Sequence, residues 1–186
     1  MFVSDVFFNY FLVIAVLLVL LGIVTLFINH HKDKLLHLEL EEFLSDKKIE
    51  YIKESNKNYD FIMKTKERTY YVSLLKIPSN SSVTINNKTT WCLRFGGSRK
   101  GRSYPNKRFL TEVEPFLKMR LPNDSDMKIV ILFPSTEVIL KYMNESDICE
   151  IHPKDTPYGY KVISYDKFKS CFDDLLYTKS KGAVKK

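Results

Sequence analysis

The sequence predicts an α/β protein in which an N-terminal transmembrane helix precedes a mixed-sheet α/β domain. The first observation is a stretch without charge, because no residue from 6 to 27 is Asp, Glu, Lys or Arg. The second is that alternating apolar runs and amphipathic runs follow one another after this stretch, a pattern typical of strands mixed with helices. The third is the run 128–133, which is apolar after Lys128, ends at Pro134 and is typical of a buried strand.

The predicted transmembrane helix covers residues 10–28. At about 1.5 Å per residue such a helix is about 28 Å long, which matches the ~30 Å hydrocarbon core of a bilayer. A cleaved signal peptide would carry a basic n-region and a small-x-small cleavage site. Residues 1–9 contain no Lys or Arg, and residues 27–32 offer no such site. These features favour an uncleaved, single-pass anchor.

The charges that flank the span predict its orientation. Lys32 and Lys34 follow it directly, whereas the segment before it carries no basic residue. Because Lys and Arg accumulate on the cytoplasmic side of a membrane, we expect the C-terminal domain to be cytoplasmic and the protein to reside in the cell membrane. The expected segments are an extracytoplasmic N-terminus (1–9), the transmembrane helix (10–28), the cytoplasmic α/β domain (29–178) and a basic tail (179–186).

The composition predicts a basic domain in a reducing compartment. All 29 Lys and Arg residues follow the span, whereas one of the 22 acids, Asp5, precedes it, which leaves the rest of the chain with a net charge of +8. The three cysteines, Cys92, Cys149 and Cys171, show no CxxC or Cys/His spacing, so no zinc site is expected. The high content of Lys, Asn, Ile and Phe with little Ala is typical of an AT-rich genome, and we interpret the source as bacterial.

Periodicity along the domain predicts an order of elements. Helices are expected at about 33–46, 109–117, 136–145 and 165–176, the last with Ser164 as its N-cap. Strands are expected at 49–53, 60–63, 69–77, 128–133, 148–152 and 160–163, and a hairpin joins 83–85 to 89–95.

This order of a helix, a three-stranded meander, a helix, a buried strand, a helix and a further strand resembles the common core of the restriction-endonuclease-like, PD-(D/E)xK nuclease superfamily. The resemblance covers roughly residues 35–165. It implies a catalytic Asp on the second strand, which falls on Asp60, and a (D/E)-x-K motif on the third, whose Lys falls on Lys76. In such a site two carboxylates hold Mg²⁺ and the Lys orients the attacking water, so that the charge developing in phosphodiester cleavage is neutralised.

The acidic member of that motif is missing from this chain. Its position is Leu74, which cannot ligate a metal, and Glu39 or Glu42 would have to supply the second carboxylate that Mg²⁺ usually needs. Three interpretations of these residues stay open: a divergent nuclease that uses Asp60 and Lys76, an inactive relative, and an unrelated α/β domain.

A basic segment without any acid extends from residue 88 to residue 111. Its candidate anion-binding residues are Arg94, Arg99, Lys100, Arg102, Lys107 and Arg108. Aromatic residues and glycines are interleaved with them, as in an exposed loop. Arg and Lys side chains suit phosphate oxygens, and aromatic rings can stack on bases, which favours nucleic acid. Anionic lipid headgroups are the competing partner, and a solvated loop is the third alternative.

We therefore expect a membrane-anchored cytoplasmic binding or scaffolding module with a degenerate nuclease-like fold. Its basic loop 94–108 would contact an anionic partner, namely nucleic acid, and no enzyme activity, metal site or cofactor is expected. The first alternative is a metal-dependent phosphodiesterase that uses Mg²⁺ with Asp60 and Lys76. The second is a membrane-complex subunit without a nucleic-acid role, whose basic loop meets lipid headgroups.

Overall fold

A computed structural model describes residues 2–54, 58–97, 104–144 and 147–176. The chain divides into two compact units, Met1–Lys47 and Lys48–Lys186. The first unit is formed by one helix, α1 (Phe2–Asp46). The predicted span and the predicted helix that follows it are therefore one continuous element.

The part of helix α1 from Ile14 to Asp46 is long and apolar enough to cross a membrane. No other helix among the described residues meets both conditions. The large apolar side chains described between Leu12 and Ile28 are exposed, with Leu18 at 66% and Phe27 at 73% of their full accessible surface, whereas Leu36, Leu40 and Leu44 near the end of the helix are buried. So many exposed apolar groups on one helix are expected in contact with lipid rather than water. Length and composition thus support the predicted membrane anchor.

Sheet A contains five strands in the order β1-β2-β3-β7-β10. They are β1 (Glu50–Lys53), β2 (Phe61–Lys64), β3 (Thr69–Lys76), β7 (Met127–Phe133) and β10 (Tyr160–Ser164). The first three form an antiparallel meander, whereas β3, β7 and β10 run parallel to one another. The predicted meander and the predicted buried strand are both confirmed, because β7 is buried along its centre.

Sheet B contains five strands in the order β6-β5-β4-β8-β9. They are β4 (Ser81–Ile85), β5 (Trp91–Phe95), β6 (Asn106–Phe109), β8 (Val138–Asn144) and β9 (Asp147–Glu150). Only the β4–β8 pair is parallel. The predicted β4–β5 hairpin is confirmed, and Asn87 stabilises its turn because its Oδ1 accepts hydrogen bonds from the backbone N–H groups of Thr89 (2.9 Å) and Thr90 (2.8 Å).

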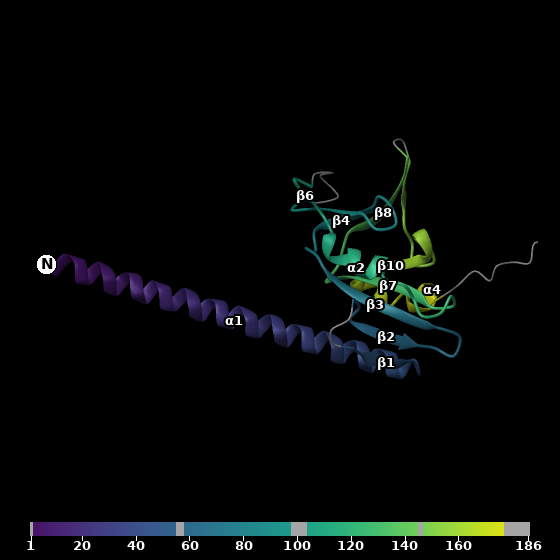
Figure 1. Cartoon of the computed structure of the whole chain (residues 1–186), viewed down its shortest axis with the longest axis horizontal. Helices are drawn as coiled ribbons and strands as arrows, with labels where there is room; N and C mark the ends of the chain where they lie inside the picture. Colours follow the sequence, from purple (N-terminus) through teal and green to yellow (C-terminus); the bar gives the residue numbers. More distant parts are fainter. Residues whose placement is uncertain (1, 55–57, 98–103, 145–146, 177–186) are drawn as a thin grey trace, which may run out of the picture. The chain divides into compact units, whose positions relative to one another are not determined.

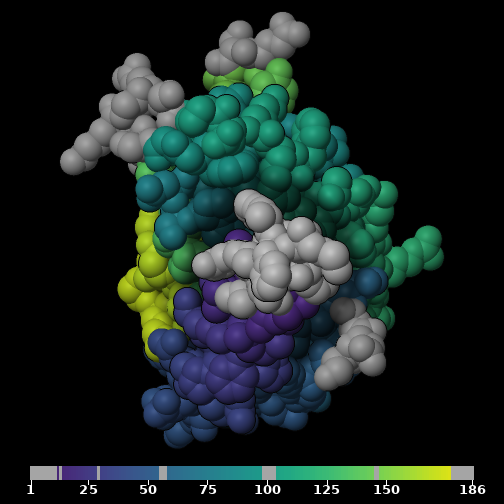
Figure 2. Space-filling view, turned by 90° about the vertical axis from the view of Figure 1, so that its left-hand side faces the viewer, coloured from purple at the N-terminus to yellow at the C-terminus, as the bar shows by residue number. Residues whose placement is uncertain are grey.

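Two connections carry the chain from sheet A to sheet B, from β3 into β4 and from β7 into β8. At this crossing the N–H of Ile77 donates to the carbonyl of Phe133 (2.8 Å), and the N–H of Glu137 donates to the carbonyl of Ser81 (2.9 Å). The sheets form two layers with the short helix α2 (Glu114–Lys118) between them (Figure 1). In the space-filling view, β4–β6 (teal) form the upper part of this unit and α4 (yellow) lies on its left (Figure 2).

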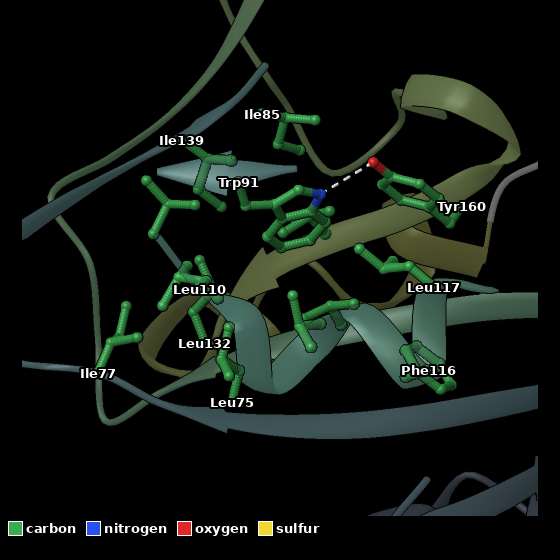
Figure 3. Close-up of a cluster of buried hydrophobic side chains, with 14 of the residues drawn as sticks. Leu75, Ile77, Ile85, Trp91, Leu110, Phe116, Leu117, Leu132, Ile139 and Tyr160 are labelled. Carbon is green, nitrogen blue, oxygen red and sulfur yellow. Dashed lines mark hydrogen bonds between the residues drawn. The ribbon is translucent and has the colours of Figure 1, made fainter. Parts of the chain in front are cut away.

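One hydrophobic core joins the two layers. Its centre is Trp91, which is 1% exposed and whose Nε1–H donates a 3.1 Å hydrogen bond to the hydroxyl of Tyr160 (Figure 3). The core takes residues from sheet A, sheet B and α2, including Leu75, Ile85, Leu110, Phe116, Leu117, Leu132 and Ile139. Sheet B therefore buries one face against sheet A.

Short helices complete the second unit. They are the 3-10 helices η2 (Thr111–Val113) and η3 (Pro157–Gly159) and the α-helices α2, α3 (Tyr165–Phe168) and α4 (Phe172–Leu176). Helix α3 packs on β7 and β10, and the rings of Phe133 and Tyr165 lie 5.1 Å apart.

Three predicted helices differ from the structure. Residues 136–145 were expected to be helical, but Val138–Asn144 is strand β8, because its side chains alternate between the core and the outer face of sheet B. The helix expected at 165–176 is two short helices, α3 and α4. The helix expected at 109–117 is a strand end followed by η2 and α2, with Pro115 in the first turn of α2. Ser164 does not cap α3, since its Oγ accepts the backbone N–H of Thr136 instead (2.9 Å).

Candidate nucleic-acid interface

The strand register brings two of the predicted basic residues together. Arg94 on β5 and Lys107 on β6 are cross-strand partners. Because partners in an antiparallel pair point to the same side of the sheet, both side chains lie on one face. Leu93, the neighbour of Arg94, is buried in the core. The Arg94–Lys107 pair therefore lies on the outer face of sheet B, where both residues are exposed.

The outer face of sheet B is hollowed into a groove of about 400 Å³. Its lining comes from strands β4, β5, β6, β8 and β9 and from Tyr104, and includes Ser82, Thr84, Cys92, Arg94, Lys107, Leu140, Tyr142 and Ile148. Tyr104 is half-buried, and its hydroxyl donates to Oε2 of Glu137 (2.7 Å), which fixes one wall. The groove thus combines two cations with two tyrosine rings and several hydroxyl groups.

Arg108 is placed differently from Lys107, although the two are adjacent in sequence. Its cross-strand partner is the core residue Leu93, so Arg108 belongs to the other side of β6. Its guanidinium binds Glu112 at two points, with Nη2 2.7 Å from Oε1 and Nη1 3.1 Å from Oε2. Burial disfavours the charge of Glu112, but the hydrogen bond and charge of Arg108 outweigh it and hold the pKa of Glu112 below its usual value. The charge of Arg108 is therefore neutralised locally.

The other three predicted anion-binding residues, Arg99, Lys100 and Arg102, lie outside the described residues. In the sequence they fall between β5 and β6, the two strands that carry Arg94 and Lys107.

Asp60 and Lys76 line a second groove, of about 490 Å³. Asp60 precedes β2, its N–H donates to the carbonyl of Val72 (2.9 Å), and its Oδ2 accepts the backbone N–H of Leu74 (2.6 Å). Asp60 therefore lies beside the C-terminal half of β3. Glu112 also lines this groove and brings a second carboxylate from η2.

The two carboxylates of this groove are the candidates for holding a metal. Mg²⁺ is commonly bound through one or two carboxylates plus water and substrate oxygens. Both are already engaged, however: Asp60 with the N–H of Leu74, and Glu112 with Arg108. Within the described ranges no cluster of three or more His, Cys, Asp or Glu residues has the arrangement of a metal site.

Sequence reasoning missed several groove residues. Tyr142 and Leu140 were assigned to a helix, so their place beside Arg94 was not foreseen. No local pattern marks them, because Ile139 and Met143 are apolar as well and the segment also fits one helical face. Glu112 was missed because Asp60 and Lys76, which line the same groove, are distant from it in sequence.

Comparisons of the chain with family models, with curated proteins and with solved structures find no match.

Proposed function

We propose that this chain is a membrane-anchored module that binds single-stranded nucleic acid on the outer face of sheet B. The observation that carries the proposal is the exposed cross-strand pair Arg94–Lys107, which lies in one groove with Tyr104 and Tyr142. In this proposal the Lys32 and Lys34 charges place the domain on the cytoplasmic side of the membrane.

The chemistry of the groove suits a single strand in two respects. Adjacent Arg and Lys side chains on a sheet can bind successive phosphates, and Arg can do so through two parallel hydrogen bonds. Aromatic side chains on an open sheet can stack on unpaired bases, and each such contact contributes about 1–3 kcal/mol. A purely electrostatic lipid-binding surface has no need of the tyrosine rings, which favours nucleic acid over headgroups.

Alanine substitution of both Arg94 and Lys107 is expected to weaken binding of a fluorescent single-stranded oligonucleotide at least tenfold, because two charge-assisted phosphate contacts are lost. The measurement is fluorescence anisotropy on the full-length chain in nanodiscs of zwitterionic lipid. Arg108→Ala is the matched control, since Arg108 adjoins Lys107 but is bound to Glu112. We expect the control to bind within about twofold of the unsubstituted chain.

A different outcome would support lipid headgroups as the partner of this surface. If the unsubstituted chain binds no oligonucleotide but its cytoplasmic unit attaches to anionic vesicles through Arg94 and Lys107, the surface is a headgroup site and the proposal is wrong. Equal losses in the double variant and in Arg108→Ala would also contradict it, because the outer face would then have no special role.

The second candidate function is a divergent Mg²⁺-dependent nuclease with a degenerate nuclease-like core. The observation that favours it is the groove shared by Asp60, Lys76 and Glu112. Asp60→Asn is expected to lower the free energy of unfolding by no more than about 1 kcal/mol, because the amide oxygen can still accept a hydrogen bond from the N–H of Leu74. In a nuclease this variant would lose Mg²⁺-dependent cleavage of a labelled oligonucleotide, and Glu112→Gln would lose it too. Cleavage that survives both substitutions would remove this candidate.

A further inference from the structure

A third groove, of about 660 Å³, lies in the second unit and shares no lining residue with the groove on the outer face of sheet B. It is formed by the β4–β5 turn, the end of α2 and the loop after it, β7 and η3. Four cationic side chains line it, namely Lys88, Lys118, Arg120 and Lys128. Two carboxylates, Asp124 and Asp126, line it as well.

Lys128 is the buried cation of this groove, at 8% exposure. Its Nζ donates to the carbonyls of Leu117 (2.7 Å) and Met119 and lies 5.7 Å from the ring centre of Phe116. An ammonium has three N–H donors, and these carbonyls use two of them. Among the described residues no carboxylate lies within ion-pairing distance of Lys128.

A buried cation without a counter-ion is unfavourable, and a bound anion would stabilise it. Burial lowers the pKa of Lys128, and the positive charge of Lys88 lowers it further. The two acids of the groove offset only part of this charge. Lys118 is paired with Glu114 (Nζ to Oε1 2.5 Å), which leaves Lys88, Arg120 and Lys128 facing Asp124 and Asp126. The groove therefore keeps positive charge available to a ligand.

An aromatic ring forms another part of the lining. Tyr158 has a backbone φ of +53°, which is unfavourable for a residue with a side chain, and Gly159 follows with a φ of +84°. Such backbone strain concentrates at sites that hold ligands. Nζ of Lys141 lies 4.8 Å from the centre of the Tyr158 ring, so the ring is held in place while the residue remains 40% exposed.

We propose that this groove binds a nucleoside phosphate. Lys88, Arg120 and Lys128 contact its phosphate groups, and the Tyr158 ring packs against its base. The phosphates supply the counter-ion that Lys128 lacks. The base stacks on the exposed ring of Tyr158 in η3. The site is independent of the proposed single-strand surface.

The test is equilibrium binding of ATP and of inorganic phosphate to the full-length chain in zwitterionic nanodiscs. ATP is expected to bind with a dissociation constant below about 1 mM. Lys88→Ala and Arg120→Ala should each weaken ATP binding about tenfold, because each removes a charge-assisted contact. Tyr158→Phe should keep the affinity, whereas Tyr158→Ala should weaken ATP binding without changing phosphate binding. Lys64→Ala is the control and should leave ATP binding unchanged, because Lys64 is an exposed cation on β2 that lines none of these grooves.

Fluorescence of Trp91, the only tryptophan of the chain, reports whether each variant keeps its core. Folded variants of Lys88 and Arg120 that bind ATP as tightly as the unsubstituted chain would overturn the proposal. An equal loss in Lys64→Ala, or no ATP binding below 1 mM, would overturn it as well. Loss of affinity for phosphate as well as ATP in Tyr158→Ala would exclude the stacking role.

Discussion

Trp91→Ala is expected to lower the free energy of unfolding of the second unit by about 3–5 kcal/mol. Trp91 is 1% exposed and belongs to the core that joins the two sheets and α2. Its ring lies 5.6 Å from that of Tyr160, centre to centre, and its Nε1–H donates to the Tyr160 hydroxyl. Alanine would leave a large cavity and also remove a hydrogen bond from a buried hydroxyl group, and both effects reduce stability.

The measurement is pulse proteolysis across a urea series, which follows the folded fraction without a fluorescent tryptophan. Tyr160→Phe is the matched variant, because it removes only the hydrogen-bond acceptor and should cost about 1 kcal/mol. If Trp91→Ala costs no more than Tyr160→Phe, the two sheets do not share the core described above.

The second large effect concerns pH. Lys161 on β10 is fully buried, and its Nζ donates to the carbonyl of Pro153 (3.4 Å). Burial lowers the pKa of Lys161 from 10.5 to about 8; Asp155 and Asp174 oppose the decrease, and Arg68 adds to it. Between these two pKa values the unfolded chain binds more protons than the folded one, so stability increases with pH. We expect the free energy of unfolding to increase by about 2 kcal/mol from pH 7 to pH 9.5 through this residue.

The same urea series, repeated at several pH values, measures this slope. Lys161→Met should remove most of the increase, because the substituted side chain does not titrate; Lys128, whose pKa is also lowered by burial, contributes the rest. The exposed Lys64→Met should retain the full increase. Burial raises the pKa of Tyr70 and of Tyr160, so their ionisation falls above this pH window. An increase of undiminished size in Lys161→Met would show that another group is responsible.

Local patterns predicted the local elements of this fold. The run before Pro134 is the buried strand β7, and the Asn87 turn joins β4 to β5. The failure at β8 has a physical cause: Val138, Ile139, Tyr142 and Met143 fit one helical face, but the segment pairs with β4, more than fifty residues away in sequence. That pairing creates sheet B, and a non-local contact of this kind leaves no local signal in a single sequence.

The candidate site was predictable in composition but not in arrangement. The basic segment 88–111 contains Arg94, Lys107 and Arg108 close together in sequence. Their separation onto two faces follows from the β5–β6 register, which depends on strand bounds that the sequence did not provide. The arrangement of the groove that contains Asp60 and Lys76 was also not predictable, because its second carboxylate comes from Glu112, which is distant from both in sequence.

The central claim is that Arg94 and Lys107 on the outer face of sheet B bind the phosphates of a single strand. Its most direct test is the salt dependence of oligonucleotide affinity for the full-length chain and for the Arg94→Ala/Lys107→Ala variant. Each phosphate contact contributes about −0.7 to the slope of log affinity against log salt for a single strand. We therefore predict that the double variant has a slope shallower by about 1.4, while Arg108→Ala keeps the original slope. An unchanged slope in the double variant would contradict the claim.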